Sequence, residues 1–140
     1  MILVDSSVLI PFLAGRDNPA VRVLHQILAE DVPYAICPYV YQEVLQGVAD
    51  EAGYRRLKAY LDTQECLWLA SSLETFADAS RLYWRLRRAG VTVRSTIDVL
   101  IARTAIEHHA LLLHADRDFD LIAAHTPELR VYPTQTGEAG

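Results

Sequence analysis

The sequence has two cysteines, one lysine and no long apolar run, and each shortage excludes a class of protein. Cys37 and Cys66 lack a metal-ligand spacing such as Cys-x-x-Cys, and two cysteines are too few for a disulfide scaffold. We expect both thiols to be reduced. The single lysine, Lys58, limits any mechanism that needs a catalytic lysine. No run reaches the roughly 18 apolar residues of a membrane span.

The apolar start of the chain, residues 1–13, resembles a secretory signal only superficially. It lacks a basic first segment and contains Asp5 within the apolar stretch. Arg16 and Asp17 follow where small residues should mark a cleavage site. We therefore expect a soluble cytoplasmic protein.

Length and composition fit one folded unit. With 140 residues, of which 51% are hydrophobic, the chain can bury one core. There is no internal repeat and no evident linker, so we expect a single domain over residues 1–140.

The charge is acidic overall but unevenly placed. A net charge of -5 argues against a protein that binds nucleic acid through general basicity. Between residues 81 and 94, however, there are five arginines and no acid: Arg81, Arg85, Arg87, Arg88 and Arg94. This run is either one basic face or an ordinary solvated helix surface.

Short apolar runs alternate with longer helical patterns. The expected strands are residues 2–5, 34–37, 67–70, 111–114 and 129–132. Helix starts are expected at Asp17 or Asn18 before Pro19, at Pro38, and at a capping box from Ser71 to Glu74. Strands separated by helices imply parallel βαβ units, so the expected class is α/β with a central parallel sheet.

Two acids lie at the ends of expected strands. Asp5 ends the first apolar run and Asp116 follows the fourth. The carboxyl edge of an open parallel sheet is where ligands bind. The alternative for each residue is helix capping, because such side chains accept hydrogen bonds from free backbone N–H groups.

Asp116 also begins an alternating acidic pattern with Asp118 and Asp120. A calcium loop needs Gly at its sixth position and Glu at its twelfth, and Leu121 and Pro127 stand there instead. We therefore expect Asp118 and Asp120 in the first turn of a short helix.

Two further acids fall on expected helices. Ser95 to Asp98 matches a capping box, but Asp98 also heads an apolar stripe through Ile101 and Ala105. A carboxylate on such a surface is costly unless it is paired or bound to metal. Glu43 lies within an expected helix over residues 39–48, where it is either a solvent-facing flank residue or part of the site.

The combination of these acids indicates a metal site. Acids from two strand ends and two helices converge in a parallel α/β sheet, and their mutual repulsion requires a cation. Hard oxygen ligands select Mg²⁺ or Mn²⁺. Such a site suits the hydrolysis of phosphodiester bonds.

Together these segments resemble a PIN domain of the VapC toxin type, from type II toxin–antitoxin systems. The resemblance rests on residues 2–9, Glu43, residues 97–105 and residues 111–119. It implies a three-layer fold with helices flanking the sheet, and an acidic quartet of Asp5, Glu43, Asp98 and Asp116. Asp118 matches an additional acid near that site. Ser6 stands where many members have Thr, so a hydroxyl is retained.

The resemblance also implies partners and a mechanism. It implies RNA cleavage, frequent homodimerisation and a VapB-type antitoxin. Asp5, Asp98 and Asp116 are expected to hold Mg²⁺ or Mn²⁺, while Glu43 completes the shell or positions water. Candidates for gripping RNA are Arg85, Arg87, Arg88 and Arg94.

Two other functions remain open from the sequence. A haloacid dehalogenase-type phosphatase also begins with a strand ending in Asp, but Ser7 stands where its second Asp belongs. The other is a catalytically silent PIN-like scaffold that binds RNA or protein, which intact acids disfavour without excluding.

Overall fold

The computed structural model describes residues 1–134, which form four short strands and seven helices. The strands are β1 (Ile2–Val4), β2 (Tyr34–Ala35), β3 (Leu111–Leu113) and β4 (Arg130–Val131). The helices are α1 (Ser6–Leu13), α2 (Pro19–Ala29), α3 (Pro38–Leu45), α4 (Glu51–Leu61), α5 (Leu73–Arg88), α6 (Thr96–Glu107) and α7 (Arg117–Ala124).

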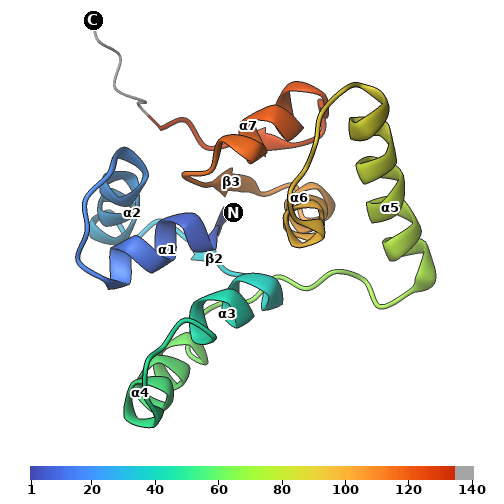
Figure 1. The fold of residues 1–140 in the computed structure, drawn as a ribbon. Coiled ribbons are helices and arrows are strands. Elements are labelled where there is room, and N and C mark those ends of the chain that lie inside the picture. The colour runs from blue at the N-terminus through green and yellow to red at the C-terminus, as the bar shows by residue number, and fades with distance from the viewer. Residues whose placement is uncertain (135–140) are drawn as a thin grey trace, which may run out of the picture.

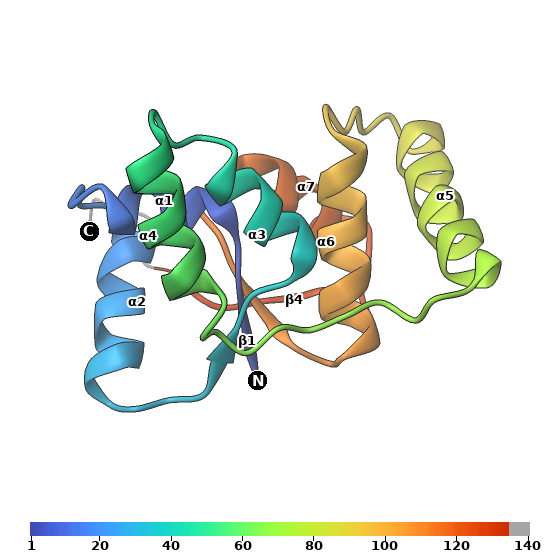
Figure 2. The ribbon, with the colours of Figure 1, turned by 90° about the horizontal axis from the view of Figure 1, so that it is seen from below.

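The four strands form one parallel sheet in the order β2-β1-β3-β4. In this order β1 is paired with β3, with Val4 opposite Leu113. The residues that follow these two strands, Asp5 and His114, therefore emerge side by side at one edge of the sheet. Helices α1 and α2 lie on one face, and α6 lies on the other with α5 outside it (Figures 1 and 2). The expected α/β class and three-layer arrangement are confirmed.

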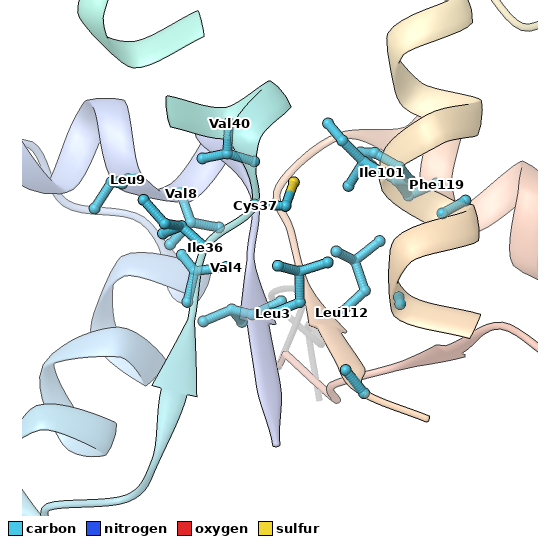
Figure 3. Close-up of a cluster of buried hydrophobic side chains, with 14 of the residues drawn as sticks. Leu3, Val4, Val8, Leu9, Ile36, Cys37, Val40, Ile101, Leu112 and Phe119 are labelled. Atoms are coloured by element: carbon cyan, nitrogen blue, oxygen red, sulfur yellow. The ribbon is translucent and has the colours of Figure 1, made fainter. Parts of the chain in front are cut away.

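The core forms because the central strands are apolar on both faces. Leu3 and Val4 of β1 and Leu112 of β3 are fully buried. Side chains from α1 and α6 close over them, including Val8 and Ile101 (Figure 3). Burial of each such side chain contributes about 1.5–3 kcal/mol, which holds the sheet edge in a fixed geometry.

The third expected strand, residues 67–70, does not form, so this prediction is wrong. Leu67 N–H donates to the Ile36 carbonyl and is buried, but the only pairing in this part of the described chain is an isolated bridge between Ile36 and Cys66. Trp68 is 67% exposed, and Ala70 N–H donates to the side chain of Glu107. The run therefore leaves the sheet after Leu67.

Two helix boundaries also differ from expectation. Helix α5 begins at Leu73 with Ser72, not Ser71, as its N-cap, and Ser72 accepts a hydrogen bond from Thr75 N–H. Farther along this helix, Leu82 and Leu86 are buried in the core. Helix α3 ends at Leu45 and does not continue to residue 48. The starts expected at Asn18 and Pro38 are confirmed.

Both cysteines are free thiols, as expected. Burial raises the pKa of Cys37 to about 12, which keeps it protonated and unreactive. Within residues 1–134, no helix combines the length and apolar character needed to cross a membrane.

Candidate active site

Asp5 caps a helix with one carboxylate oxygen and leaves the other without a partner. Its Oδ2 accepts hydrogen bonds from the Ser7 N–H at 3.1 Å and the Ser7 hydroxyl at 2.6 Å. Its Oδ1 is buried and has no hydrogen-bond donor among the described residues. Burial raises the pKa of Asp5, against the effect of the Ser7 bonds. A buried oxygen of this kind is unfavourable unless a cation or water satisfies it.

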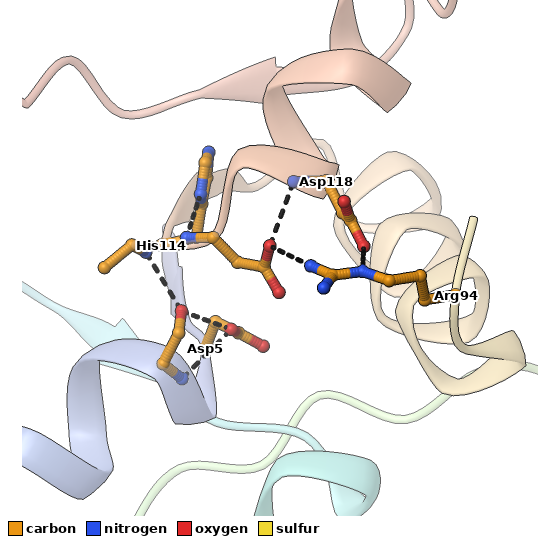
Figure 4. A network of polar contacts seen from close by, with 7 residues as sticks. Asp5, Arg94, His114 and Asp118 are labelled. Carbon is orange, nitrogen blue, oxygen red and sulfur yellow. Dashed lines mark hydrogen bonds and ion pairs between the residues drawn. The ribbon is translucent and has the colours of Figure 1, made fainter. Parts of the chain in front are cut away.

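Ser7 ties the ends of the two central strands together. Its hydroxyl donates to Asp5 and accepts from the Ala115 N–H at 2.9 Å (Figure 4). Asp5 lies after β1, and Ala115 lies two residues beyond β3. The serine thus links the ends of the two central strands.

Asp116 likewise caps a helix while facing the other acids. Its Oδ1 accepts a hydrogen bond from Asp118 N–H at 2.9 Å at the start of α7. The capping and site interpretations of Asp5 and Asp116 are therefore compatible, because each carboxylate has two oxygens. Asp118 lies in the first turn of α7, as expected, and is 6% exposed.

Asp98 lies at the centre of the acidic site, which we define as Asp5, Glu43, Asp98, Asp116 and Asp118. Burial is the largest cause that raises its pKa to about 7, followed by the negative charges of the four other acids, of which Asp5 acts most strongly. One oxygen each from Asp98, Asp116 and Asp118 lie within 4.8 Å of one another. This spacing matches a set of ligands around one cation.

The capping box at Ser95 forms only in part. Ser95 is the N-cap of α6 and accepts from Ile97 N–H at 3.2 Å. Among the described residues, the Asp98 carboxylate accepts no hydrogen bond from the Ser95 N–H, which a complete capping box would have. Asp98 is consequently free to face the other acids.

Glu43 joins the site from α3. It is half-buried, and its Oε1 accepts a hydrogen bond from the Ser6 hydroxyl at 3.0 Å. Its charge raises the pKa of both Asp5 and Asp98, so its carboxylate lies near theirs. All four acids of the expected quartet, with Asp118, therefore come together at this edge of the sheet.

Arg94 is the arginine that reaches the acidic site. Its Nε donates to Asp118 Oδ2 at 3.0 Å, and its Nη2 lies 3.8 Å from Asp116 Oδ1 (Figure 4). Within the described chain, the other arginines of residues 81–94 make no ion pair with these acids. They lie on or beside the outer helix α5, where Arg88 stacks over Trp84 at 5.0 Å.

The residues present fit a hard divalent cation. They offer carboxylate oxygens, among them the buried and unpartnered Asp5 Oδ1. The three residues whose oxygens lie within 4.8 Å of one another are Asp98, Asp116 and Asp118. From the sequence, Asp5 and not Asp118 was expected as the third metal ligand. The signal for Asp118 was its two-residue spacing from Asp116, which places both at the start of α7.

Comparison with known proteins agrees with this architecture. The family model for the PIN domain matches residues 2–125. VapC ribonuclease Mb1587 of Mycobacterium bovis is 34% identical over 127 residues, covering 90% of this chain and 94% of that protein. Ribonuclease VapC11 of Mycobacterium tuberculosis gives the same values.

Solved structures share the fold at lower identity. VapBC2 from Rickettsia felis, bound to a promoter DNA fragment, has a TM-score of 0.68 at 19% identity, covering 94% of this chain and 98% of that one. A toxin–antitoxin complex from Klebsiella pneumoniae has a TM-score of 0.67 at 22% identity, covering 92% and 95%. The family match over most of the sequence and the 34% identity establish that this chain belongs to the PIN domain family.

Proposed function

We propose that this protein is a metal-dependent endoribonuclease that hydrolyses RNA phosphodiester bonds. The observation that carries the proposal is the gathering of five acids at one sheet edge, with the Asp98 pKa raised to about 7 by burial and by its neighbours. So many carboxylates need a cation to offset their repulsion. The 34% identity to VapC ribonucleases supports RNA as the substrate.

We assign Asp5, Asp98 and Asp116 as metal ligands, with Asp118 as an additional acid. A bound Mg²⁺ or Mn²⁺ lowers the pKa of a coordinated water and offsets charge on the scissile phosphate. Asp98 would have to be ionised to hold the metal, because a ligating carboxylate is ionised. Ser7 holds Asp5 in place through Oδ2, which leaves Oδ1 for the metal or its water.

Glu43 is proposed to position the attacking water. The Ser6 hydroxyl holds its Oε1 at 3.0 Å, so Oε2 is available for the water. Glu43 reaches the site from α3, whereas Asp116 and Asp118 reach it from the start of α7. Water and scissile phosphate can thus lie between acids that come from different elements.

Arg94 is the favoured contact to the substrate among the arginines. It is 72% exposed and already lies beside Asp116 and Asp118, so it can reach a phosphate bound there. Arg85, Arg87 and Arg88 are proposed to contact more distant phosphates. RNA binding should then weaken as salt rises.

We also propose the biological setting. The chain acts as the toxin of a toxin–antitoxin pair, with a VapB-type antitoxin as partner and a homodimer as its assembly. The solved toxin–antitoxin complexes with the same fold support this proposal. Residues 1–140 form one nuclease domain that works on RNA in the cytoplasm.

The phosphatase alternative gains no support from the site. A phosphatase of that type also needs a lysine. The only lysine of the sequence, Lys58, lies on α4, and its Nζ is 2.7 Å from Asp62 Oδ2. Ser7, in the position of the second phosphatase Asp, bonds to Asp5 and Ala115. The catalytically silent scaffold remains as an outcome of the test.

The test is cleavage of total cellular RNA by purified protein freed of any copurified partner. Reactions contain Mg²⁺, Mn²⁺ or EDTA, beside Asp98→Asn and the control Asp31→Asn. Asp31 is exposed and has a φ of 55°, a conformation that Asn adopts readily. We expect cleavage that needs metal and Asp98 but tolerates the control. Folded protein that cleaves nothing contradicts the nuclease and favours the scaffold.

A further inference from the structure

A cavity of about 630 Å³ lies beside the acidic site and shares Asp116 with it. One part of its wall is apolar, formed by Pro19 and Ala20 in the first turn of α2 and by Val131 and Tyr132 at the end of β4. The polar part includes His114 and Asp120. The volume lies within the roughly 300–1,000 Å³ of small-molecule sites.

His114 lines this cavity, and its ring carries a buried N–H group. The Asp116 N–H donates to its Nδ1 at 3.1 Å, so Nδ1 carries a lone pair and the neutral ring carries its proton on Nε2. The His114 side chain is 4% exposed, and among the described residues Nε2 has no hydrogen-bond acceptor. Asp120 Oδ1 lies 3.3 Å away without forming a hydrogen bond. A buried donor without an acceptor is unfavourable, so we expect a bound molecule to supply the acceptor.

The charges of the wall indicate what that partner is. Asp116 and Asp120 line the cavity, and among the described residues that line it Arg117 is the one cation. A phosphate deep in the cavity is therefore disfavoured, whereas a hydroxyl suits it. A hydroxyl oxygen can accept from His114 Nε2 and donate its own proton to Asp120. The Asp120 side chain is 65% exposed, so it can rotate to admit the group.

The apolar wall suits the flat part of the same ligand. Nucleic-acid bases stack on aromatic side chains whatever their sequence. Tyr132 is half-buried at the cavity, and its backbone N–H is fixed by a bond to the Leu112 carbonyl at 2.8 Å. A hydroxyl near His114 and a flat ring near Tyr132 together describe a ribonucleoside.

We propose that this cavity binds one nucleoside of the RNA, next to the phosphate that is cleaved. Its ribose 2′-hydroxyl lies between His114 and Asp120, and its base lies against Tyr132. The inference rests on the proposed ribonuclease function, which supplies the RNA. It assigns the chain a means to distinguish RNA from DNA at that position, because deoxyribose lacks the hydroxyl.

The first experiment measures nucleoside binding without catalysis. ¹⁵N-labelled full-length protein in EDTA is titrated with adenosine, guanosine, cytidine and uridine, each beside its 2′-deoxy form. We expect at least one ribonucleoside to shift the amide signals of Ala20, Asp120 and Tyr132. Its 2′-deoxy form should bind about tenfold more weakly, the effect of one lost hydrogen bond to a charged group. Shifts from no nucleoside, or equal shifts from both sugars, overturn the proposal.

Variants test the two parts of the cavity separately. Tyr132→Ala removes the stacking surface and should weaken ribonucleoside binding about tenfold. Asp120→Ala should weaken the preference for ribose, because only the hydrogen bond from His114 remains, while the base still stacks. Tyr54→Ala on the exposed side of α4 is the matched aromatic control and should bind as the wild type does. Unchanged binding by Tyr132→Ala overturns the assignment of the base.

Parallel cleavage of total RNA separates this proposal from the one on which it rests. If the wild-type protein cleaves RNA but binds no nucleoside in the cavity, the nuclease function stands and the proposed subsite is wrong. If the protein cleaves no RNA but binds ribonucleosides in the cavity, the ribonucleoside site stands and the nuclease function is wrong. Loss of RNA cleavage efficiency by Tyr132→Ala, with the Tyr54→Ala control unaffected, supports both.

Discussion

Arg94 and Asp118 form an ion pair inside the acidic site, with Arg94 Nε donating to Asp118 Oδ2 over 3.0 Å. The hydrogen bond and the acidic charges nearby raise the pKa of Arg94, which therefore stays protonated. Asp118 is also one of the three residues whose oxygens lie within 4.8 Å of one another. Arg94 thus provides positive charge where a divalent cation is expected to bind.

Replacing Arg94 should strengthen the binding of divalent cations. In Arg94→Ala the acids lose a competing positive charge, so affinity for Mn²⁺ should rise about two- to fivefold, a modest effect because the arginine is exposed. Calorimetric titration measures this affinity. Arg94→Lys keeps the charge and is the control. Weaker Mn²⁺ binding by Arg94→Ala contradicts the competition.

The raised pKa of Asp98 predicts that stability without metal falls as pH rises. The pKa of Asp98 is about 7 in the folded chain against 3.8 for an unperturbed aspartate, so the folded state holds this proton more tightly. The contribution is fully present below about pH 4 and is lost as pH rises through about 7. Thermal unfolding in EDTA from pH 4 to 8 should show this loss in the wild type relative to Asp98→Asn. Parallel curves for the two proteins rule it out.

Cation binding should depend on pH for the same reason. Metal ligation requires ionised Asp98, so binding releases its proton. Below about pH 7, affinity for Mn²⁺ should fall about tenfold per pH unit if one proton is released. Titrations in buffers of different ionisation enthalpy count the protons released. Affinity that is flat between pH 5.5 and 7 argues that Asp98 is not a ligand.

Glu43→Gln should separate catalysis from folding. Glutamine retains an oxygen that can accept from the Ser6 hydroxyl, so the fold should be unchanged. Cleavage should fall by about 100-fold or more if Glu43 positions the attacking water. Single-turnover cleavage and Mn²⁺ titration are compared with Gln42→Ala, an exposed neighbour in α3. Wild-type rates in Glu43→Gln are incompatible with the assigned role.

Ser7→Ala should destabilise the chain. The change leaves the Ala115 N–H without its acceptor and removes the 2.6 Å bond to Asp5. Loss of these bonds should lower the free energy of unfolding by about 1–3 kcal/mol. Urea denaturation measures it beside Ser71→Ala, an exposed serine outside the helices. An equal effect in both variants means that Ser7 does not tie the strand ends.

Local signals in the sequence determined the class of the fold and the chemistry of the site. Apolar runs between helical patterns predicted the parallel sheet, and Asp5 and Asp116 directly after such runs predicted acids at its edge. These predictions succeed because strand ends and helix caps depend on neighbouring residues. Residues 67–70 are also an apolar run but did not become a strand, because the described residues show no strand pairing beyond the Ile36–Cys66 bridge and the bond from Leu67 N–H.

Only the tertiary structure decided which of these groups meet. Pairing of β1 with β3 brings Ser7 to Ala115 across 108 positions of sequence. Arg94 could equally have faced solvent with the arginines of α5, and nothing near His114 in the sequence indicates the cavity lined by α2 and β4. Such contacts join segments that are distant along the chain, so they follow from the order of strands and the packing of helices rather than from local sequence.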